Sequence, residues 1–554
     1  MKKNSILAAL LVAAAFAVFA PQSSFAQNSD QDSHDRAGRF EFKSGTLVLS
    51  RSVYAGTADS VKVGQTLPPG CVAGTVTLPL LAGGTTTVKV KCATAVADGT
   101  YPTVFNNDGP DGSFGITSPI FLDSLSTDGR QLGTLAVPSD RIVTSFSSKS
   151  ELALNRSVDG KSFTFVGYHG GTGFVTGPNQ LDVSNSNTPG VVDPTNPVVS
   201  KYFRSVAEVD AQGHIQITDG NGYSGNNGRA AIKGNNTYYM SGNDNNGGLS
   251  SAQLTGTQIG VNLITSTGVE LLLPGQTPPI PPAINKIGEF AITQAGYKTA
   301  DKAGKDNNFR GLTIFNNTLF VTKGSGGNGI NTVYQVGVAG TLPTGTTSQL
   351  VTEPLTILPG LPTALAAGTD QNGKPAPVSF PFGIFFADAN TLYVCDEGDG
   401  TLVTPAVNGN VADAASQATA GVQKWILSNG TWHLAYVLQN GLNIGVPYSV
   451  ANVPAAFNPA TGGCRNITGK VHHNGTVDIF AITSTISASG DQGADPNKLV
   501  KVTDVLTATS LPTAKGNSDD DRKIGQFTTL RTANAGEVLR GVTFAPDERD
   551  EDED

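Results

Sequence analysis

Three arginines occupy the same place in three similar stretches of the chain. Arg229, Arg310 and Arg540 each come directly before a short apolar run. A guanidinium group donates forked hydrogen bonds that match carboxylates, phosphates and sulfates. If the stretches are copies of one unit, we expect their arginines to converge and bind an anion, with Lys323 as a further candidate. The alternative is that each arginine pairs with a carboxylate or a backbone carbonyl of the adjacent copy.

Carboxylates and amides beside flexible glycines form a second candidate site. Asp396, Glu397 and Asp399 lie in "CDEGDG", and Asn243 and Asp244 lie in "SGNDNNGG". Hard oxygen ligands of this kind suit calcium. Neither segment has the spacing of an EF-hand, so ordinary solvated turns are the alternative. Calcium is the one cofactor that these residues suggest, and nothing in the sequence requires it.

His169, which opens the loop "HGGTG", is the histidine best placed for general-base chemistry. A solvent-exposed loop histidine without a catalytic role is the alternative. We interpret His472 and His473, which lie near a tight turn, as structural.

The elements that must position these residues form a repeat. The stretch "FRGLTIFNNTLFVTKGSGGNG" (309–329) is matched by 380–400 and 227–248, and more weakly by 465–484 and 150–171. Each copy has two short apolar runs around Asn-Asn, Asn-Gly or a similar pair, which predicts a hairpin with a tight turn. A second hairpin follows each copy, so the repeat has four strands.

Four-stranded repeats without a confident helix predict an all-β propeller. Five repeats are complete, and two strands are left over at 45–56 and 538–546. We expect these two segments to pair and to close a six-bladed β-propeller, because a closed ring leaves no open edge. Seven blades are the alternative.

This pattern of four-stranded repeats resembles the six-bladed β-propeller superfamily, which includes the NHL-repeat, gluconolactonase-like, soluble aldose dehydrogenase and phytase-like proteins. The resemblance spans about residues 39–546 and implies the fold alone. No catalytic motif of these groups matches, so no residue role is carried over.

Most of the surplus chain falls on one face of the expected propeller. The turns inside hairpins are tight, whereas the segments between hairpins and between blades are long. Loops on a rigid scaffold commonly carry binding sites, so we expect the site on this long-loop face. The arginine position should surround the mouth of the central channel there, with Phe382 and Thr468 as its counterparts in two other blades.

Four cysteines, at 71, 92, 395 and 464, suggest disulfides in an exported chain. Four cysteines allow three connectivities. We favour Cys71 with Cys92, flanking a Thr/Val-rich hairpin, and Cys395 with Cys464, clamping two loops of neighbouring blades.

The N-terminal segment of the chain predicts export. Residues 1–26 have a basic start, an apolar core and small residues before Ala26, which is typical of a cleaved signal peptide. We assign 27–38 to a polar linker, 39–546 to the propeller with its insertions, and 547–554 to an acidic tail. Periplasmic and extracellular locations both fit. No membrane span is expected.

The charge excludes one class of partner. A net charge of −9 argues against a general nucleic-acid binder.

From the arginines and the long loops together, we expect a monomeric propeller that binds a small anionic molecule, a glycan or a protein through its long-loop face. The alternative is an enzyme on that face, either a calcium-dependent hydrolase of esters, lactones or phosphoesters or a quinone-dependent sugar dehydrogenase.

Overall fold

A computed structural model describes residues 40–54, most of 63–94, 117–170, 203–243, 261–265, 285–299, 308–400, 418–487, 493–512 and 524–547, with short interruptions in several ranges. Residues 40–554 belong to one compact unit. The predicted signal peptide and linker lie outside the described residues. Asp244 and Cys71 do so too.

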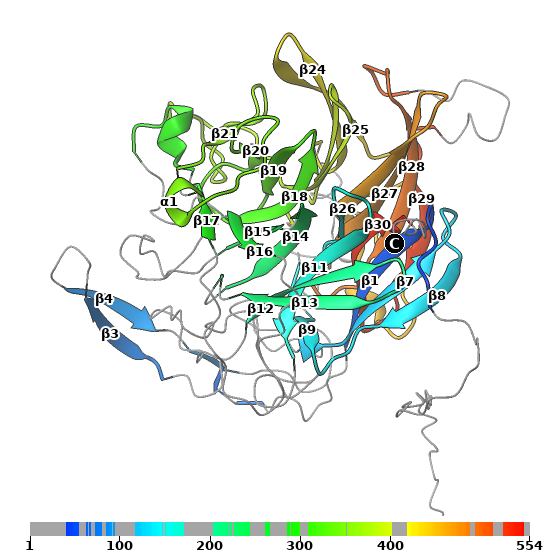
Figure 1. Cartoon of the computed structure of the whole chain (residues 1–554), viewed down its shortest axis with the longest axis horizontal. Helices are drawn as coiled ribbons and strands as arrows, with labels where there is room; N and C mark the ends of the chain where they lie inside the picture. Colours follow the sequence, from blue (N-terminus) through cyan, green and yellow to red (C-terminus); the bar gives the residue numbers. More distant parts are fainter. Residues whose placement is uncertain are drawn as a thin grey trace, which may run out of the picture. The chain divides into compact units, whose positions relative to one another are not determined.

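The fold is an all-β propeller with almost no helix (Figure 1). Five antiparallel sheets have the four strands of a blade, and we name each by its first strand in the order of pairing. The strands are β30 (Glu537–Phe544), β1 (Leu47–Val53), β7 (Ile120–Leu125) and β8 (Gln131–Ala136); β14 (Gly228–Gly234), β15 (Thr237–Gly242), β16 (Val261–Thr265) and β17 (Asn285–Ile287); β18 (Phe309–Phe315), β19 (Thr318–Lys323), β20 (Thr332–Val336) and β21 (Leu355–Ile357); β22 (Pro381–Asp388), β23 (Thr391–Asp396), β24 (Gly421–Ser428) and β25 (Thr431–Leu438); and β26 (Ala460–Val471), β27 (Thr476–Ile486), β28 (Lys498–Val505) and β29 (Thr528–Thr532).

The count of four-stranded blades is therefore five, and the predicted six or seven is not found. A sixth sheet departs from the pattern, with the order β13 (Ile215–Gly220), β12 (Arg204–Asp210), β11 (Ser162–His169), β9 (Ile142–Ser145) and β6 (Thr117–Ser118). Its β11 pairs with the short β10 (Asn155–Arg156) at one end and with β9 at the other. The expected single inner strand is thus replaced by two short pieces. The chain between them carries Lys149 and Glu151.

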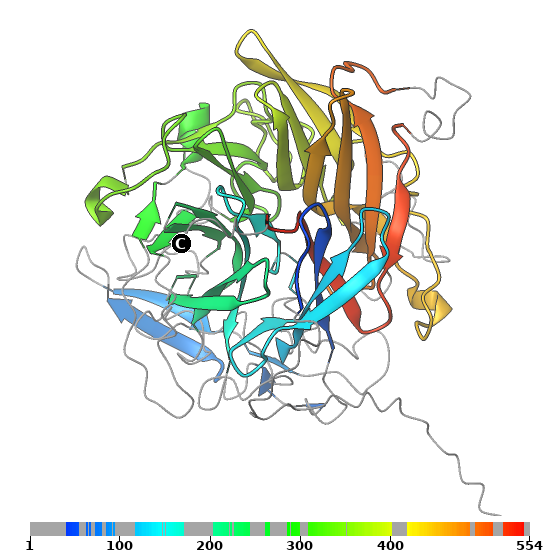
Figure 2. The ribbon, with the colours of Figure 1, turned by 45° about the vertical axis from the view of Figure 1, so that its right-hand side comes forward.

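The two ends of the described chain meet in the β30 blade. β30 pairs antiparallel with β1, from Leu47 opposite Phe544 to Val53 opposite Glu537. Figure 2 shows the dark-blue β1 beside the red β30. The predicted pairing of these two segments is confirmed. Asp123 of β7 then joins this blade to its neighbour, because it accepts hydrogen bonds from Arg51 (2.8 Å) and from Arg531 of β29 (2.6 Å).

The tight turns follow from local residue chemistry. Asn316 and Asn317 have φ values of 46° and 54° between β18 and β19. Two consecutive positive φ angles are the requirement of the turn that suits a two-residue hairpin, and asparagine tolerates them well. The hairpins predicted at this repeat and at its copies are confirmed.

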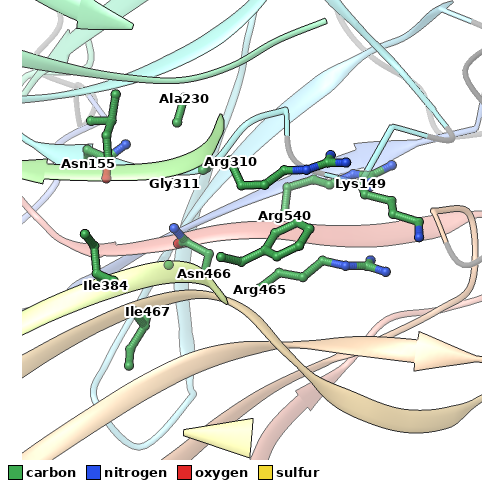
Figure 3. Close-up of a pocket in the computed structure, with 14 residues that line it drawn as sticks. Lys149, Asn155, Ala230, Arg310, Gly311, Ile384, Arg465, Asn466, Ile467 and Arg540 are labelled. Carbon is green, nitrogen blue, oxygen red and sulfur yellow. The ribbon is translucent and has the colours of Figure 1, made fainter. Parts of the chain in front are cut away.

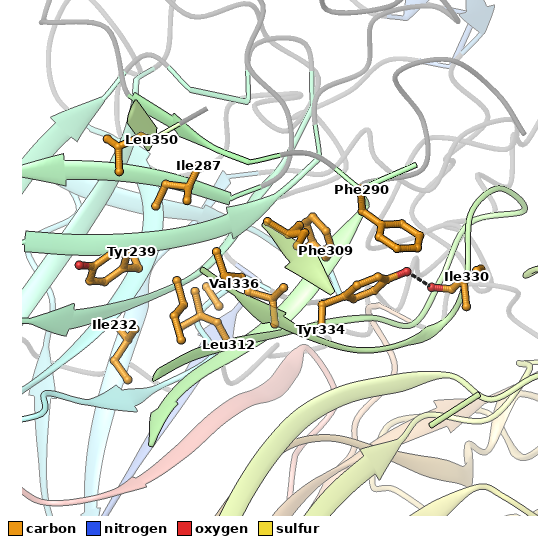
Figure 4. Packing of buried hydrophobic residues seen from close by; sticks show 14 of the residues in the cluster. Ile232, Tyr239, Ile287, Phe290, Phe309, Leu312, Ile330, Tyr334, Val336 and Leu350 are labelled. Atoms are coloured by element: carbon orange, nitrogen blue, oxygen red, sulfur yellow. Dashed lines mark hydrogen bonds between the residues drawn. The ribbon is translucent and has the colours of Figure 1, made fainter. Parts of the chain in front are cut away.

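Apolar side chains fill the space between blades. One cluster joins the β14 and β18 blades and includes Tyr239, Phe309, Leu312 and Tyr334, all at most 2% exposed (Figure 4). The Tyr334 hydroxyl donates to the carbonyl of Ile330 at 2.7 Å, so its polar end is satisfied inside the core. Each such aromatic stabilises the fold by about 3–5 kcal/mol relative to alanine.

Two further features lie outside the blades. The predicted hairpin between Cys71 and Cys92 is present as β3 (Gly74–Pro79) and β4 (Thr85–Val90), and β2 (Thr66–Leu67) pairs with β5 (Ala93–Thr94). Cys92 is in a disulfide, and its predicted partner is outside the described residues.

Among the described helices, none is long and apolar enough to cross a membrane.

Candidate functional site

Five first strands share one irregularity. β14, β18, β22, β26 and β30 each contain a β-bulge, seen as a shift of register against the second strand of the blade. The bulges contain Arg229, Arg310, Phe382, Arg465 and Arg540. A bulge adds a residue without a partner in the ladder and re-aims its side chain. The repeat therefore presents one redirected side chain per blade, and four of the five are arginines.

The residue after each bulged side chain is small or short, because the neighbouring backbone comes close. A Cβ at Gly311 would lie 2.1 Å from the carbonyl oxygen of Phe382. A Cβ at Gly541 would lie 2.4 Å from the carbonyl oxygen of Leu152. These glycines let the first strands approach one another.

Four of the five bulged residues line a cavity among the first strands. Arg310, Phe382, Arg465 and Arg540 contribute to it, with Lys149 from the interrupted strand. Its volume is about 20 Å³, which is room for about one water molecule. In Figure 3 the side chains of Arg310, Arg465 and Lys149 extend toward the same side, away from Ile384 and Ile467. Because Arg310 precedes the apolar part of β18, the cationic end is the one nearer the long loops.

Glu397 is a carboxylate that interacts with these cationic side chains. Its Oε2 lies 2.9 Å from Nε of Arg465, and its side chain is 8% exposed. Burial alone would raise the pKa of Glu397. The charges of Lys149, Arg465 and Arg310 outweigh that effect, so the pKa is lowered from its ordinary value. Glu397 is therefore ionised at neutral pH and acts as an internal counter-ion.

The arginines also influence one another. Burial lowers the pKa of Arg229 to about 10, against the opposing effect of Glu151. Burial lowers the pKa of Arg310 well below its usual value, and the charges of Arg229 and Arg465 add to the decrease. The Arg310 guanidinium also lies 5.1 Å from the centre of the Phe382 ring, so the aromatic bulge residue stacks with its cationic neighbour.

Arg540 is held by the interrupted strand. Its two terminal nitrogens donate to the carbonyls of Ser148 and Phe146, and Nε donates to Ser52 at 3.2 Å. Glu151 lies nearby, is 1% exposed and accepts a hydrogen bond from Tyr168. Burial raises the pKa of Glu151, although Tyr168 and the charge of Arg540 oppose the increase.

Of the positions predicted for this site, Arg310, Arg540 and Phe382 line the cavity, whereas Arg229 and Thr468 do not. Phe382 lines the cavity as the predicted counterpart of the arginines. Thr468 does not, and Arg465 takes the place assigned to it. The missed signal was local, because Arg465 is followed by a short residue and an apolar one, as Arg310 is.

Lys323 and His169 lie elsewhere. Lys323 is fully buried in β19, donates to Asn331 at 2.9 Å and does not line the cavity. His169 ends β11 and is 3% exposed, so the expectation of an exposed loop histidine is wrong. Its Nδ1 lies 2.9 Å from Asp219, which also accepts a hydrogen bond from Ser205.

The described residues considered for calcium have different surroundings. Asp396 is fully buried and accepts hydrogen bonds from the Phe380 and Gly398 amides and from Gln423, each at 2.9 Å. Asp399 is exposed, and Asn243 is half-buried beyond the end of β15. In the described part of the chain, no group of three or more histidine, cysteine or carboxylate side chains could hold a metal ion.

The predicted disulfide between Cys395 and Cys464 is confirmed. It joins β23 to β26 of the next blade, with Cα atoms 5.2 Å apart. Both cysteines are fully buried in the core between these blades, and Cys464 lies inside its strand. The expectation that they clamp surface loops is therefore wrong.

Comparisons with known proteins add little to this geometry. No family model matches the chain, and no curated protein matches it. A mutant of the Synechocystis apocarotenoid oxygenase aligns over 91% of this chain and 92% of its own, with 10% identity and a TM-score of 0.32. The hemagglutinin-neuraminidase ectodomain of parainfluenza virus 5 aligns over 89% of each chain, with 9% identity and a TM-score of 0.29. Similarities this low carry no argument about function, and membership of a particular propeller group stays a prediction.

Proposed function

We propose that this chain is an exported β-propeller that binds an anionic ligand at the cationic end of its central cavity, on the long-loop face. The observation that carries the proposal is the repeated bulge, which supplies four arginines at equivalent positions, three of which line the cavity. Guanidinium groups match carboxylate, phosphate and sulfate oxygens by forked hydrogen bonds.

The size of the cavity limits what enters it. A volume of about 20 Å³ admits one small group and excludes a whole organic molecule. The ligand therefore presents a terminal acidic group to Arg310 and its neighbours, and the remainder lies over the long loops. Glu397 neutralises part of the charge, and this lowers the cost of keeping the arginines buried before the ligand binds.

Closure of the propeller into six blades belongs to the same proposal. The first strands are in contact in the order β14, β18, β22, β26 and β30, while β14 also contacts β11 and β30 contacts β10. This sequence of contacts supports the β11 sheet as a sixth, modified blade. Export is supported by the internal disulfide, because such bonds persist in oxidising compartments.

We favour a binding function over the two enzymatic alternatives. A calcium-dependent hydrolase needs free carboxylates, whereas Glu397 is engaged by Arg465 and Asp396 by three N–H donors. A dehydrogenase needs an accessible base, whereas His169 is buried beside Asp219.

The test is thermal stabilisation by anions. Citrate, phosphate, sulfate and glucuronate would be added to wild type, to Arg310→Ala and to Arg130→Ala, in which an exposed arginine of the β7–β8 turn is removed. An anion that binds the folded state raises the melting temperature. We expect protection of wild type and Arg130→Ala, and affinity lower by roughly 1.5–3 kcal/mol in Arg310→Ala.

The outcome that contradicts the proposal is specific. Arg310→Ala would be less stable than wild type, and none of the anions would protect either protein. The arginines would then serve to hold neighbouring blades together.

A further inference from the structure

A second cavity lies on the opposite face, where the tight turns are. It has a volume of about 570 Å³ and lies between the β26 blade and the β7–β8 turn of the β30 blade. His472 is in the β26–β27 turn, and Thr127 and Asp128 are in the β7–β8 turn. Pockets of about 300–1,000 Å³ are the usual size for small-molecule ligands. The cavity is therefore large enough for an organic ligand.

An ordered polar cluster forms one wall. Asp478 Oδ2 lies 2.8 Å from Lys501 Nζ and 3.2 Å from His472 Nε2. Thr503 donates to Asp478 Oδ1 at 2.6 Å. These contacts fix the rotamers of side chains that are each partly exposed to the cavity. A carboxylate has about four acceptor positions, so Asp478 retains capacity for one further donor.

The rest of the lining alternates hydrogen-bonding groups with small apolar surfaces. Thr476 and Gln526 offer both donors and acceptors, and Ile524 and Leu530 supply apolar contact. Charged groups of both signs lie at the cavity, with Asp128 and Asp478 against Lys501. The lining lacks the group of arginines that would favour an anion, which separates this cavity from the arginine site.

We propose that this cavity binds a neutral oligosaccharide of two to three sugar units. Ring hydroxyls both donate and accept, as the lining does, and the C–H face of a sugar ring fits the apolar contact from Ile524 and Leu530. Asp478 accepts from a sugar hydroxyl, and Lys501 donates to one. The proposal is independent of the anion site, because the two cavities share no lining residue.

The experiment uses the full chain and three neutral probes: maltotriose, cellotriose and N-acetylated chitotriose. Saturation-transfer NMR and calorimetric titration would measure binding in the millimolar range. Thr528→Trp places a large ring in the cavity from an exposed position on β29. Thr529→Trp is the matched control, because successive residues of a strand face opposite sides and Thr529 does not line the cavity.

We expect at least one trisaccharide to bind wild type and Thr529→Trp equally and to lose affinity for Thr528→Trp by about tenfold or more. Asp478→Asn, checked for folding by its melting curve, should weaken binding by roughly tenfold, the loss for one hydrogen bond to a charged group. Two results overturn the proposal. One is that none of the three sugars binds, and the other is that a sugar binds all variants equally. Binding of an uncharged Gly/Ser peptide in place of the sugars would overturn it as well.

Discussion

Glu397 and Arg465 form a buried ion pair across the boundary between the β22 and β26 blades, with Oε2 and Nε 2.9 Å apart. Glu397 lies two residues after Cys395, and Arg465 follows Cys464 directly. The disulfide between those cysteines therefore holds the two partners close together, and Arg465 lines the cationic cavity. Covalent and electrostatic links coincide at one point between two blades.

The ion pair should have a large effect on stability. Glu397→Gln leaves Arg465 buried without its carboxylate, so we expect a loss of about 3–5 kcal/mol in urea unfolding at neutral pH. The pKa of Glu397 is lowered in the folded state, so its contribution is present above its ordinary pKa of about 4.3 and is lost as pH falls below it. The difference between wild type and variant should shrink in acid. An equal difference at every pH would contradict this account.

Asp396 should show the opposite dependence on pH. Burial raises its pKa to about 7, although backbone donors oppose the increase. A raised carboxyl pKa favours the folded state in acid, and that advantage is lost as pH rises from about 4 to about 7. Wild type should lose a few kcal/mol over this range, at ~1.4 kcal/mol per pKa unit, relative to Asp396→Asn. Parallel curves of unfolding free energy against pH would show that Asp396 does not titrate there.

Loss of the disulfide should destabilise the fold strongly. The cysteines are 69 residues apart, and closing a loop of that length in the unfolded chain corresponds to about 4 kcal/mol. We expect the double variant Cys395→Ala/Cys464→Ala to melt at lower temperature than wild type without reductant. Its response to reductant should be smaller than that of wild type. Identical melting of the two proteins under oxidising conditions would exclude a stabilising role.

The C-terminal strand should be required for folding. Deleting residues 538–554 removes all of β30 except Glu537 and leaves β1 paired with β7 alone. We expect loss of the cooperative thermal transition. Deleting only 548–554, which follow the last described residue, is the control and should leave the transition unchanged. A normal transition in the longer deletion would mean that β1 and β30 do not hold the unit together.

Close approach of the first strands can be tested with one methyl group. Gly311→Ala would place a Cβ 2.1 Å from the Phe382 carbonyl oxygen, so we expect destabilisation of about 1–3 kcal/mol or more. Gly327→Ala is the matched control, because nothing lies within 4 Å of its Cβ position. Denaturant melts of the two variants should differ clearly. Equal stability would mean that the strands separate without cost.

Several features of this protein were decided by the sequence itself. Asn316 and Asn317 specify their hairpin because asparagine accepts positive φ at small cost, whatever the rest of the chain does. Repetition of that pattern predicted the propeller, and the unpaired segments at 45–56 and 538–546 predicted the pairing of β1 with β30. The Cys395–Cys464 bridge followed from neighbouring positions in the repeat. These are properties of a few adjacent residues or of their periodic recurrence.

Only the tertiary structure decided which side chains reach the cavity. The bulge that redirects Arg465 depends on register against β27, and register depends on pairing between strands rather than on the residues of one strand. The interruption that places Lys149 and Glu151 beside Arg540 likewise depends on how β9 and β10 divide the edge of β11. Burial of His169 beside Asp219, and the opposite pKa shifts of the adjacent Asp396 and Glu397, depend on groups brought from distant parts of the chain. Desolvation and charge act through space, so the order of residues alone does not contain them.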